Sequence, residues 1–246
     1  LDEVVQLLKA PARDSYSFKK EGEASSNMGD EEFVDLVKKG IKHCMRGDVF
    51  QIVLSRRFSQ AYSGDDFSLY RVLRSINPSP YIFYFDFGGF KIFGSSPEAQ
   101  LVVQDGVAEI HPIAGTFIQT GNDVQDEARA KELAKDLKEN AEHMMLVDLA
   151  RNDLSRHGQE VTVEKDREVQ FYSHVIHLVS KVTGQKKKET ATMQIVADTF
   201  PAGTLSGAPK HRAMQLIESY ETTDRSFYGG AIGFLDFKGN YNHAII

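Results

Sequence analysis

The sequence predicts an α+β fold with largely antiparallel sheets, and three observations support this class. Runs of β-branched and aromatic residues follow one another closely between residues 81 and 115. Turn residues, Gly88-Gly89 and Asp105-Gly106, separate them where hairpins need positive φ. Helical segments lie between strand clusters without the regular alternation of a parallel sheet. We expect an N-terminal helix and linker over residues 1–29 and one catalytic domain over residues 30–246.

Apolar periodicity and turn residues place the individual elements. Helices are expected at residues 1–11, from Asp30 to Gly47, and at 66–76, 126–156, 191–200 and 211–221. Strands are expected at 49–58, 81–87, 90–96, 99–104, 107–115, 158–166 and 174–185, with a closing hairpin in 228–246. Residues 12–29 are polar and rich in Gly and Ser, which favours a linker or mobile arm. The four strands between residues 81 and 115 are expected to form an antiparallel meander.

The long helix over residues 126–156 contains no Gly or Pro and is rich in strong helix formers. One stripe at helical spacing is expected to face a core: Leu133, Leu137, Ala141, Met144 and Asp148. The second half also carries Glu142, His143 and Asp153 within an apolar run. Buried carboxylates need partners, so this helix is either an unusual core helix or one wall of a polar cleft.

Composition and charge restrict the classes of partner and compartment. A formal charge of −6 and a pI near 5.8 argue against a nucleic-acid or membrane-surface partner. The single cysteine, Cys44, allows no internal disulfide, so a reducing, cytoplasmic setting is expected. No apolar run approaches the length of a membrane span. The chain starts without Met and stops in mid-pattern at YNHAII, which suggests a fragment of a longer polypeptide.

The loop PAGTLSGAPK (201–210) is the most distinctive in the chain. Its glycines and hydroxyl side chains place backbone N–H groups ahead of a helix N-terminus, where an anion is favoured. Lys210 would add a positive charge. The spacing is not that of a phosphate-binding P-loop. A well-capped helix after a tight turn explains the same residues, and both interpretations stay open.

Three side chains and one turn could carry chemistry, and each has a structural alternative. Glu98 follows a strand and a proline, which suits either a general acid or base or a turn residue. His177 lies in an apolar strand, where a hydrogen-bonded core histidine is the simpler interpretation. Glu142 could bind a hard metal, since Mg²⁺ takes one or two carboxylates plus water and substrate oxygens. The turn at 228–230 could expose backbone to a ligand or relieve packing at a bend.

Taken together, these motifs resemble a known family. The blocks that carry the resemblance are GDVFQIVLSRRF, NPSPYIFYF, GSSPE, HPIAGT, DLKENAEHMMLVDLARND, HVIHLVSKVTG, FPAGTLSGAPKHRAMQLIE and YGGAIGF. Their order is similar to that in the chorismate-utilising enzymes, above all anthranilate synthase component I, from about Asp30 to the last residue. The resemblance implies two largely antiparallel sheets with helices packed outside, truncated in this chain, and an active site in the cleft between the sheets.

The resemblance also implies roles for individual residues. Glu142 looks like a Mg²⁺ ligand and Glu98 like the acid that helps to expel the ring hydroxyl, while His177, Thr204 and Tyr228 look like substrate contacts. The residues implied to bind chorismate are Ala114, Gly115, Thr116, Gly203, Thr204, Tyr228 and Gly229. The segment implied to form one wall of a tryptophan feedback pocket is Asn77, Pro78, Ser79, Pro80 and Tyr81.

Two positions select the reaction within the family. Relatives that add water carry a lysine at the position of Gln51, and an amide cannot deprotonate water, so ammonia is the expected nucleophile. The aminodeoxychorismate branch usually carries a lysine at the position of Ala114. The expected products are therefore anthranilate and pyruvate, with aminodeoxychorismate synthase component I as the alternative.

The source of ammonia and the completeness of the site are further implications. Ammonia would come from a glutamine amidotransferase subunit (component II) or from solution, because this chain has no nucleophile elbow. The family continues beyond the position of Ile246 with an arginine that grips a substrate carboxylate and a second metal carboxylate. This chain is therefore expected to be weakly active or inactive, and a non-catalytic piece that binds the amidotransferase is a further alternative.

Overall fold

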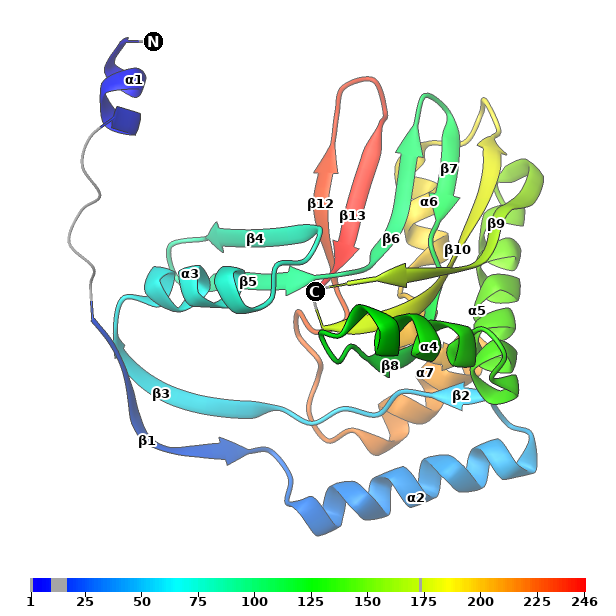
Figure 1. The fold of residues 1–246 in the computed structure, drawn as a ribbon, viewed down its shortest axis with the longest axis horizontal. Coiled ribbons are helices and arrows are strands. Elements are labelled where there is room, and N and C mark those ends of the chain that lie inside the picture. The colour runs from blue at the N-terminus through cyan, green and yellow to red at the C-terminus, as the bar shows by residue number, and fades with distance from the viewer. Residues whose placement is uncertain (1, 10–16, 173) are drawn as a thin grey trace.

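Helices and strands follow one another irregularly along the computed structural model, which describes residues 2–9, 17–172 and 174–246 (Figure 1). The helices are α1 (Asp2–Lys9), α2 (Asp30–Arg46), α3 (Asp66–Ile76), α4 (Asp123–Leu133), α5 (Leu137–Ser155), α6 (Thr192–Thr199) and α7 (Lys210–Tyr220), with a 3₁₀ turn at Gly203–Leu205. The strands are β1 (Phe18–Ser26), β2 (Gln51–Ile52), β3 (Phe58–Gly64), β4 (Tyr81–Asp86), β5 (Lys91–Ser96), β6 (Ala99–Gln104), β7 (Val107–Ile110), β8 (Ile113–Ile118), β9 (Gly158–Phe171), β10 (Val175–Lys186), β11 (Gly207–Ala208), β12 (Ala231–Leu235) and β13 (Tyr241–Ile245). Within the described ranges, no helix has both the length and the apolar character that crossing a bilayer requires.

One seven-stranded sheet organises the chain. Its strand order is β12-β13-β6-β7-β10-β8, and β9 also pairs with β10. The other paired strands among the described residues are β1 with β3, β4 with β5, and β2 with β11. Every pairing is antiparallel, which confirms the predicted fold class. Figure 1 shows helix α5 running beside the sheet, where it contacts β7, β8, β9 and β10.

The main hydrophobic core lies between this sheet and helices α5 and α6. Its buried side chains are Leu101, Val103, Ala108, Val147, Ala150, Leu154, Val182, Ile195, Val196 and Tyr241. Burial of a side chain such as Leu154 stabilises the fold by roughly 1.5–3 kcal/mol. The core therefore fixes the rotation of α5 against the sheet, and with it the direction in which Glu142 points.

The predicted long helix is two helices, which corrects its predicted apolar stripe. Helix α4 ends at Leu133, and Asp136 begins α5 by accepting hydrogen bonds from the backbone N–H groups of Lys138 and Glu139. Because Asp136 has extended backbone angles, helical phase is not carried across the break. Leu133 is buried, but Leu137 is 87% exposed. Ala141, Met144 and Asp148 are exposed as well. The face that α5 buries consists of His143, Leu146, Val147, Ala150, Asp153 and Leu154.

Three further predictions differ from the structure. Within the expected linker, residues 18–26 form strand β1, whose mostly exposed polar side chains give no alternation to detect; residues 10–16 lie outside the described ranges. Of the strand expected at 49–58, only Gln51–Ile52 is paired as β2, while β3 begins at Phe58. The expected meander is right only as two hairpins, β4 with β5 and β6 with β7; β5 and β6 lie in different sheets, and the strand expected at 107–115 is divided into β7 and the start of β8, which pairs with β10. Pro112, which has no N–H to donate, lies between β7 and β8.

Candidate active site

Glu98 and Thr204 form a direct contact between segments far apart in the sequence. Glu98 lies at the junction of β5 and β6, and Thr204 lies in the 3₁₀ turn. The Thr204 hydroxyl donates to the carboxyl of Glu98, with Oγ1 3.1 Å from Oε1 and 3.2 Å from Oε2. Burial raises the pKa of Glu98 to about 7, although the hydrogen bond from Thr204 opposes this rise. A carboxyl group with this pKa can hold a proton at neutral pH and deliver it to a substrate.

His177 lies on β10 directly opposite Thr116 of β8. Its Nδ1 atom is 3.1 Å from the carbonyl oxygen of Gly115 and 3.2 Å from Thr116 Oγ1. Burial lowers the pKa of His177, although the hydrogen bond to Gly115 opposes this. The ring is therefore neutral near pH 7. When Nδ1 carries the proton and donates it to Gly115, Nε2 has a free lone pair that can accept a proton.

A bulge at Gly115 produces the contact with His177. The pairing passes from His177 with Thr116 to Leu178 with Ala114, so Gly115 has no partner on β10. Its φ of +68° is in the left-handed region, and an added Cβ would lie 3.1 Å from Leu133 Cδ1. Glycine meets both requirements. Ala114 is buried beside the bulge.

Glu142 and Gln51 form the second polar pair. Glu142 projects from α5, and Gln51 lies in β2, opposite Ala208 of β11. Gln51 Nε2 donates to Glu142 Oε1 over 3.4 Å, while the buried Gln51 Oε1 has no hydrogen-bond partner among the described residues. Leaving a buried acceptor unpaired is costly, so the site suits a ligand that presents an N–H group or a cation. The carboxylate and the amide oxygen are hard donors of the kind Mg²⁺ accepts. The described residues contain no cluster of three or more His, Cys, Asp or Glu side chains that could hold a metal alone.

The loop that carries Thr204 joins the two pairs. Gly203 packs against α5 so closely that an added Cβ would come 2.2 Å from Leu149 Cδ2. Just beyond the 3₁₀ turn, the Ser206 carbonyl accepts from the N–H of Val53, next to β2. We call residues 203–206 the Thr204 loop. It contacts the helix that carries Glu142 and the chain next to the strand that carries Gln51, so the elements that carry Thr204, Glu142 and Gln51 lie side by side.

The Thr204 loop differs from the predicted anion site in two ways. The N–H groups of Leu205 and Ser206 donate to the carbonyls of Ala202 and Gly203, so they are already occupied. Lys210 forms a salt bridge with Asp153, with Nζ 2.7 Å from Oδ2, and also donates to the Thr199 carbonyl. Its ammonium group therefore holds helix α7 against α5, and the expectation that it adds positive charge for an anion is wrong.

The remaining predicted residues lie at the margins of this region. Tyr228 is 47% exposed, and the N–H of Gly229 donates to the carbonyl of Ile246. The segment from Asn77 to Tyr81 connects α3 with β4, where Tyr81 pairs with Ser96, two residues before Glu98. The segment is thus placed beside the strand that leads to the acid, and within the described ranges no hydrogen bond joins its side chains to Glu98 or Thr204.

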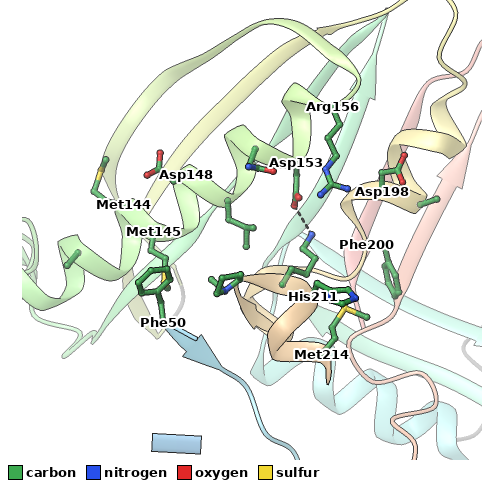
Figure 2. A pocket seen from close by; sticks show the side chains of 17 residues that line it. Phe50, Met144, Met145, Asp148, Asp153, Arg156, Asp198, Phe200, His211 and Met214 are labelled. Atoms are coloured by element: carbon green, nitrogen blue, oxygen red, sulfur yellow. Dashed lines mark hydrogen bonds and ion pairs between the residues drawn. The ribbon is translucent and has the colours of Figure 1, made fainter. Parts of the chain in front are cut away.

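A much larger cavity than the one at Glu98 lies elsewhere. It has a volume of about 930 Å³ and lies between α5, the end of α6 and α7 (Figure 2). Phe50, Met145 and Met214 line it together with the Asp153–Lys210 salt bridge, whereas Glu98, Glu142, His177 and Thr204 do not. A cavity of about 40 Å³ touches Glu98, Gly203 and Thr204. We place the candidate chemistry at the small cavity, because Glu98, whose pKa burial raises to about 7, lines it together with its partner Thr204.

Sequence reasoning missed two residues at this site. The Tyr172 ring lies edge-on to His177, with centroids 5.3 Å apart, and burial together with the charge of Glu98 raises the pKa of its phenol. Arg225 donates hydrogen bonds to the carbonyls of Leu205 and Val53. No pattern marks Tyr172. Arg225 could have been found from its position four residues after Glu221 and three before Tyr228.

Comparisons with known proteins agree with the resemblance in the sequence. A family model described as chorismate binding enzyme matches residues 1–246. Anthranilate synthase component 1 of Aquifex aeolicus (strain VF5) is 46% identical over 222 residues, which cover 89% of this chain and 45% of that protein. The Bacillus subtilis (strain 168) protein of the same name is 46% identical over 234 residues, or 94% of this chain and 45% of that protein.

Solved structures extend the comparison to the fold. Anthranilate synthase component I from Streptococcus pneumoniae TIGR4 superposes with a TM-score of 0.89 at 39% identity, over 99% of this chain and 55% of that chain. MenF, the menaquinone-specific isochorismate synthase from Escherichia coli, gives a TM-score of 0.86 at 21% identity, over 99% and 57%, and shows the fold alone. The chain spans about half the length of the curated relatives it matches. By its sequence and its fold, the chain belongs to the family of chorismate binding enzymes.

Proposed function

We propose that this chain carries the catalytic residues that convert chorismate and ammonia to anthranilate and pyruvate in tryptophan biosynthesis. The contact between Glu98 and Thr204 carries the proposal, since it orients a carboxyl whose pKa burial raises to about 7, which suits a proton donor. The names of the most similar relatives support the same reaction.

The residues divide the reaction into two steps. In the first, Glu98 protonates the C4 hydroxyl, the C4–O bond breaks with loss of water, and ammonia forms a bond to C2. In the second, the C2 proton and the enolpyruvyl group leave, the ring becomes aromatic and pyruvate is released. His177 is suited to accept the C2 proton, because its ring is neutral near pH 7 and Nδ1 is held by Gly115.

We assign metal binding to Glu142 and the choice of nucleophile to Gln51. Glu142 would hold Mg²⁺, and the ion, when bound, would supply positive charge for a substrate carboxylate within a chain whose net charge is −6. The unpaired Gln51 Oε1 is an acceptor suited to an N–H of ammonia. Ala114 has no amine with which to form a covalent intermediate, which favours anthranilate over aminodeoxychorismate.

Partners and regulation complete the proposal. A glutamine amidotransferase subunit would supply ammonia, and tryptophan would inhibit the intact enzyme through the segment from Asn77 to Tyr81. We place the protein in the cytoplasm, where chorismate would be available and the free thiol of Cys44 would stay reduced.

Product analysis tests the proposal directly. Two proteins are compared: the product of the full coding sequence that contains this chain, and residues 1–246 alone. Each is incubated with chorismate, ammonium and Mg²⁺, and the reaction product is identified by fluorescence and chromatography. We expect anthranilate and an equal amount of pyruvate from the full coding sequence, with much weaker turnover from residues 1–246. Isochorismate or aminodeoxychorismate as the product would contradict the proposed reaction.

A further inference from the structure

Arg225 lies at the point where three chain segments of the site meet. It is in the connection between α7 and β12. Its side chain is 19% exposed. Its Nη1 donates to the Leu205 carbonyl over 2.6 Å, and its Nη2 donates to the Val53 carbonyl over 2.6 Å. The same guanidinium therefore holds the Thr204 loop and the chain just after β2.

The Glu221 carboxylate holds the guanidinium in this orientation. Arg225 Nε donates to Glu221 Oε2 over 2.8 Å and Nη2 donates to Oε1 over 2.7 Å. Glu221 also accepts from the backbone N–H and the hydroxyl of Ser55, 2.8 and 3.0 Å away. An arginine makes such planar, multiple contacts, whereas the ammonium group of lysine cannot reproduce the fork.

The third segment is the turn that carries Tyr228. The Arg225 carbonyl accepts from the Tyr228 N–H over 2.9 Å, and the guanidinium carbon lies 5.7 Å from the centroid of the Tyr228 ring. The Thr204 loop, β2 and this turn carry Thr204, Gln51 and Tyr228 respectively. One side chain therefore contacts all three segments while itself remaining outside the Glu98–Thr204 pair.

We propose that Arg225 is a positioning residue for the active site. By holding the carbonyls of Leu205 and Val53, it fixes the Thr204 loop so that the Thr204 hydroxyl reaches Glu98, and it fixes β2 so that Gln51 lies beside Glu142. The consequence for turnover rests on the proposed function, while the consequence for Glu98 rests on the geometry alone.

The first measurement is independent of catalysis. In protein labelled with ¹³C at the glutamate carboxyls, the Glu98 signal is assigned by its loss in Glu98→Gln and is titrated across neutral pH. The Thr204 hydroxyl donates to this carboxyl, the charge of Glu98 acts on the Tyr172 phenol, and Asp153, which is paired with Lys210, lines the same small cavity. We expect Arg225→Lys to raise the titration midpoint of Glu98, as Thr204→Val does, because the first displaces and the second removes the hydroxyl that stabilises the carboxylate.

A double variant tests whether Arg225 acts through Thr204. In Thr204→Val/Arg225→Lys, the midpoint should equal that of Thr204→Val, because the hydroxyl that Arg225 positions is already absent. Arg56→Lys is the matched control: the Arg56 side chain is 21% exposed and pairs with Asp30 instead of holding a carbonyl of the Thr204 loop. It should leave the midpoint unchanged. If Arg225→Lys does not fold, Glu221→Gln serves instead, because it weakens the ion pair that holds the Arg225 guanidinium. It should shift the Glu98 midpoint in the same direction.

Turnover separates this inference from the proposed function. We expect Arg225→Lys to lower kcat for anthranilate formation by roughly 10–100-fold, with a much smaller change in KM for chorismate, since misplacement of about 1 Å has effects of this size. A Glu98 midpoint that stays at the wild-type value in Arg225→Lys, or that rises further in the double variant, overturns the inference. Absence of anthranilate from the wild-type enzyme, with the expected midpoints, overturns the proposed function instead.

Discussion

The regions around Glu98 and Glu221, on two sides of the Thr204 loop, treat a buried carboxyl in opposite ways. Glu98 accepts hydrogen bonds from one neutral hydroxyl, and burial raises its pKa to about 7. Burial would also raise the pKa of Glu221, but hydrogen bonds from Arg225 and Ser55 outweigh it and hold this pKa below its usual value. The number and charge of the donors, together with the depth of burial, therefore separate a carboxyl that can deliver a proton from one that stays ionised.

The largest expected effect comes from removing the proton of Glu98. Glu98→Gln keeps the shape and a hydrogen bond to Thr204 but cannot protonate the leaving hydroxyl. We expect kcat for anthranilate formation to fall by about 10²–10⁴-fold, the usual contribution of a general acid. Steady-state kinetics with ammonium and Mg²⁺ would measure this loss. A decrease of less than about tenfold would assign the proton to another group.

The same substitution at Glu221 should change the free energy of unfolding more than it changes kcat. Glu221→Gln leaves the buried guanidinium of Arg225 without its ionic partner, which we expect to lower the free energy of unfolding by about 3 kcal/mol at neutral pH. Urea denaturation followed by circular dichroism would measure it. Glu127→Gln is the control, because its salt bridge to Lys131 is 69% exposed on both sides and should contribute less than about 0.5 kcal/mol. Equal effects in the two variants would show that the Glu221–Arg225 pair is not a stabilising contact.

The difference between the two carboxyls was only partly predictable from the sequence. Glu98 could be singled out, because a carboxylate after a strand and a proline at a junction is a local pattern. Its partner Thr204 is 106 residues away, and the contact depends on the approach of the loop to α5, which no local pattern contains. The helices over 66–76 and 211–221 were predicted well because their apolar periodicity is local. Sheet partners such as β6 with β13 depend on the whole topology.

The pH dependence of stability should have opposite signs at the two sites. The pKa of Glu98 is raised in the folded protein, so its contribution is fully present below the unfolded value of 4.5 and is lost as pH rises through about 7. Glu98→Gln should therefore stabilise the protein at alkaline pH relative to pH 5, by at most about 3 kcal/mol for a rise from 4.5 to about 7.

The pKa of Glu221 is lowered, so its contribution is present above the unfolded value of 4.5 and is lost as pH falls through the folded pKa. Glu221→Gln should therefore destabilise the protein less in acid than at neutral pH. Glu98→Gln should stabilise the protein at alkaline pH, and this gain should disappear in acid, so the two changes in unfolding free energy have opposite slopes against pH. Thermal denaturation of both variants over a pH series measures the two slopes. Parallel slopes would contradict the assignment of opposite pKa shifts.

The smallest expected effects compare two hydroxyls that each donate to one of these carboxyls. Thr204→Val removes the hydrogen bond to Glu98, so the pKa of Glu98 rises and the alkaline limb of the kcat/KM profile should move to higher pH. Ser55→Ala removes one hydroxyl bond to Glu221, while the Ser55 N–H and Arg225 still hold that carboxylate. We expect it to lower the free energy of unfolding by about 1 kcal/mol and to leave the pH profile in place. Thr204→Ser, which retains the hydroxyl, should restore the wild-type limb. If Ser55→Ala moved the alkaline limb as far as Thr204→Val does, the Glu221 region would influence the pKa of Glu98. The contrast between a proton-holding and an ionised carboxyl would then fail.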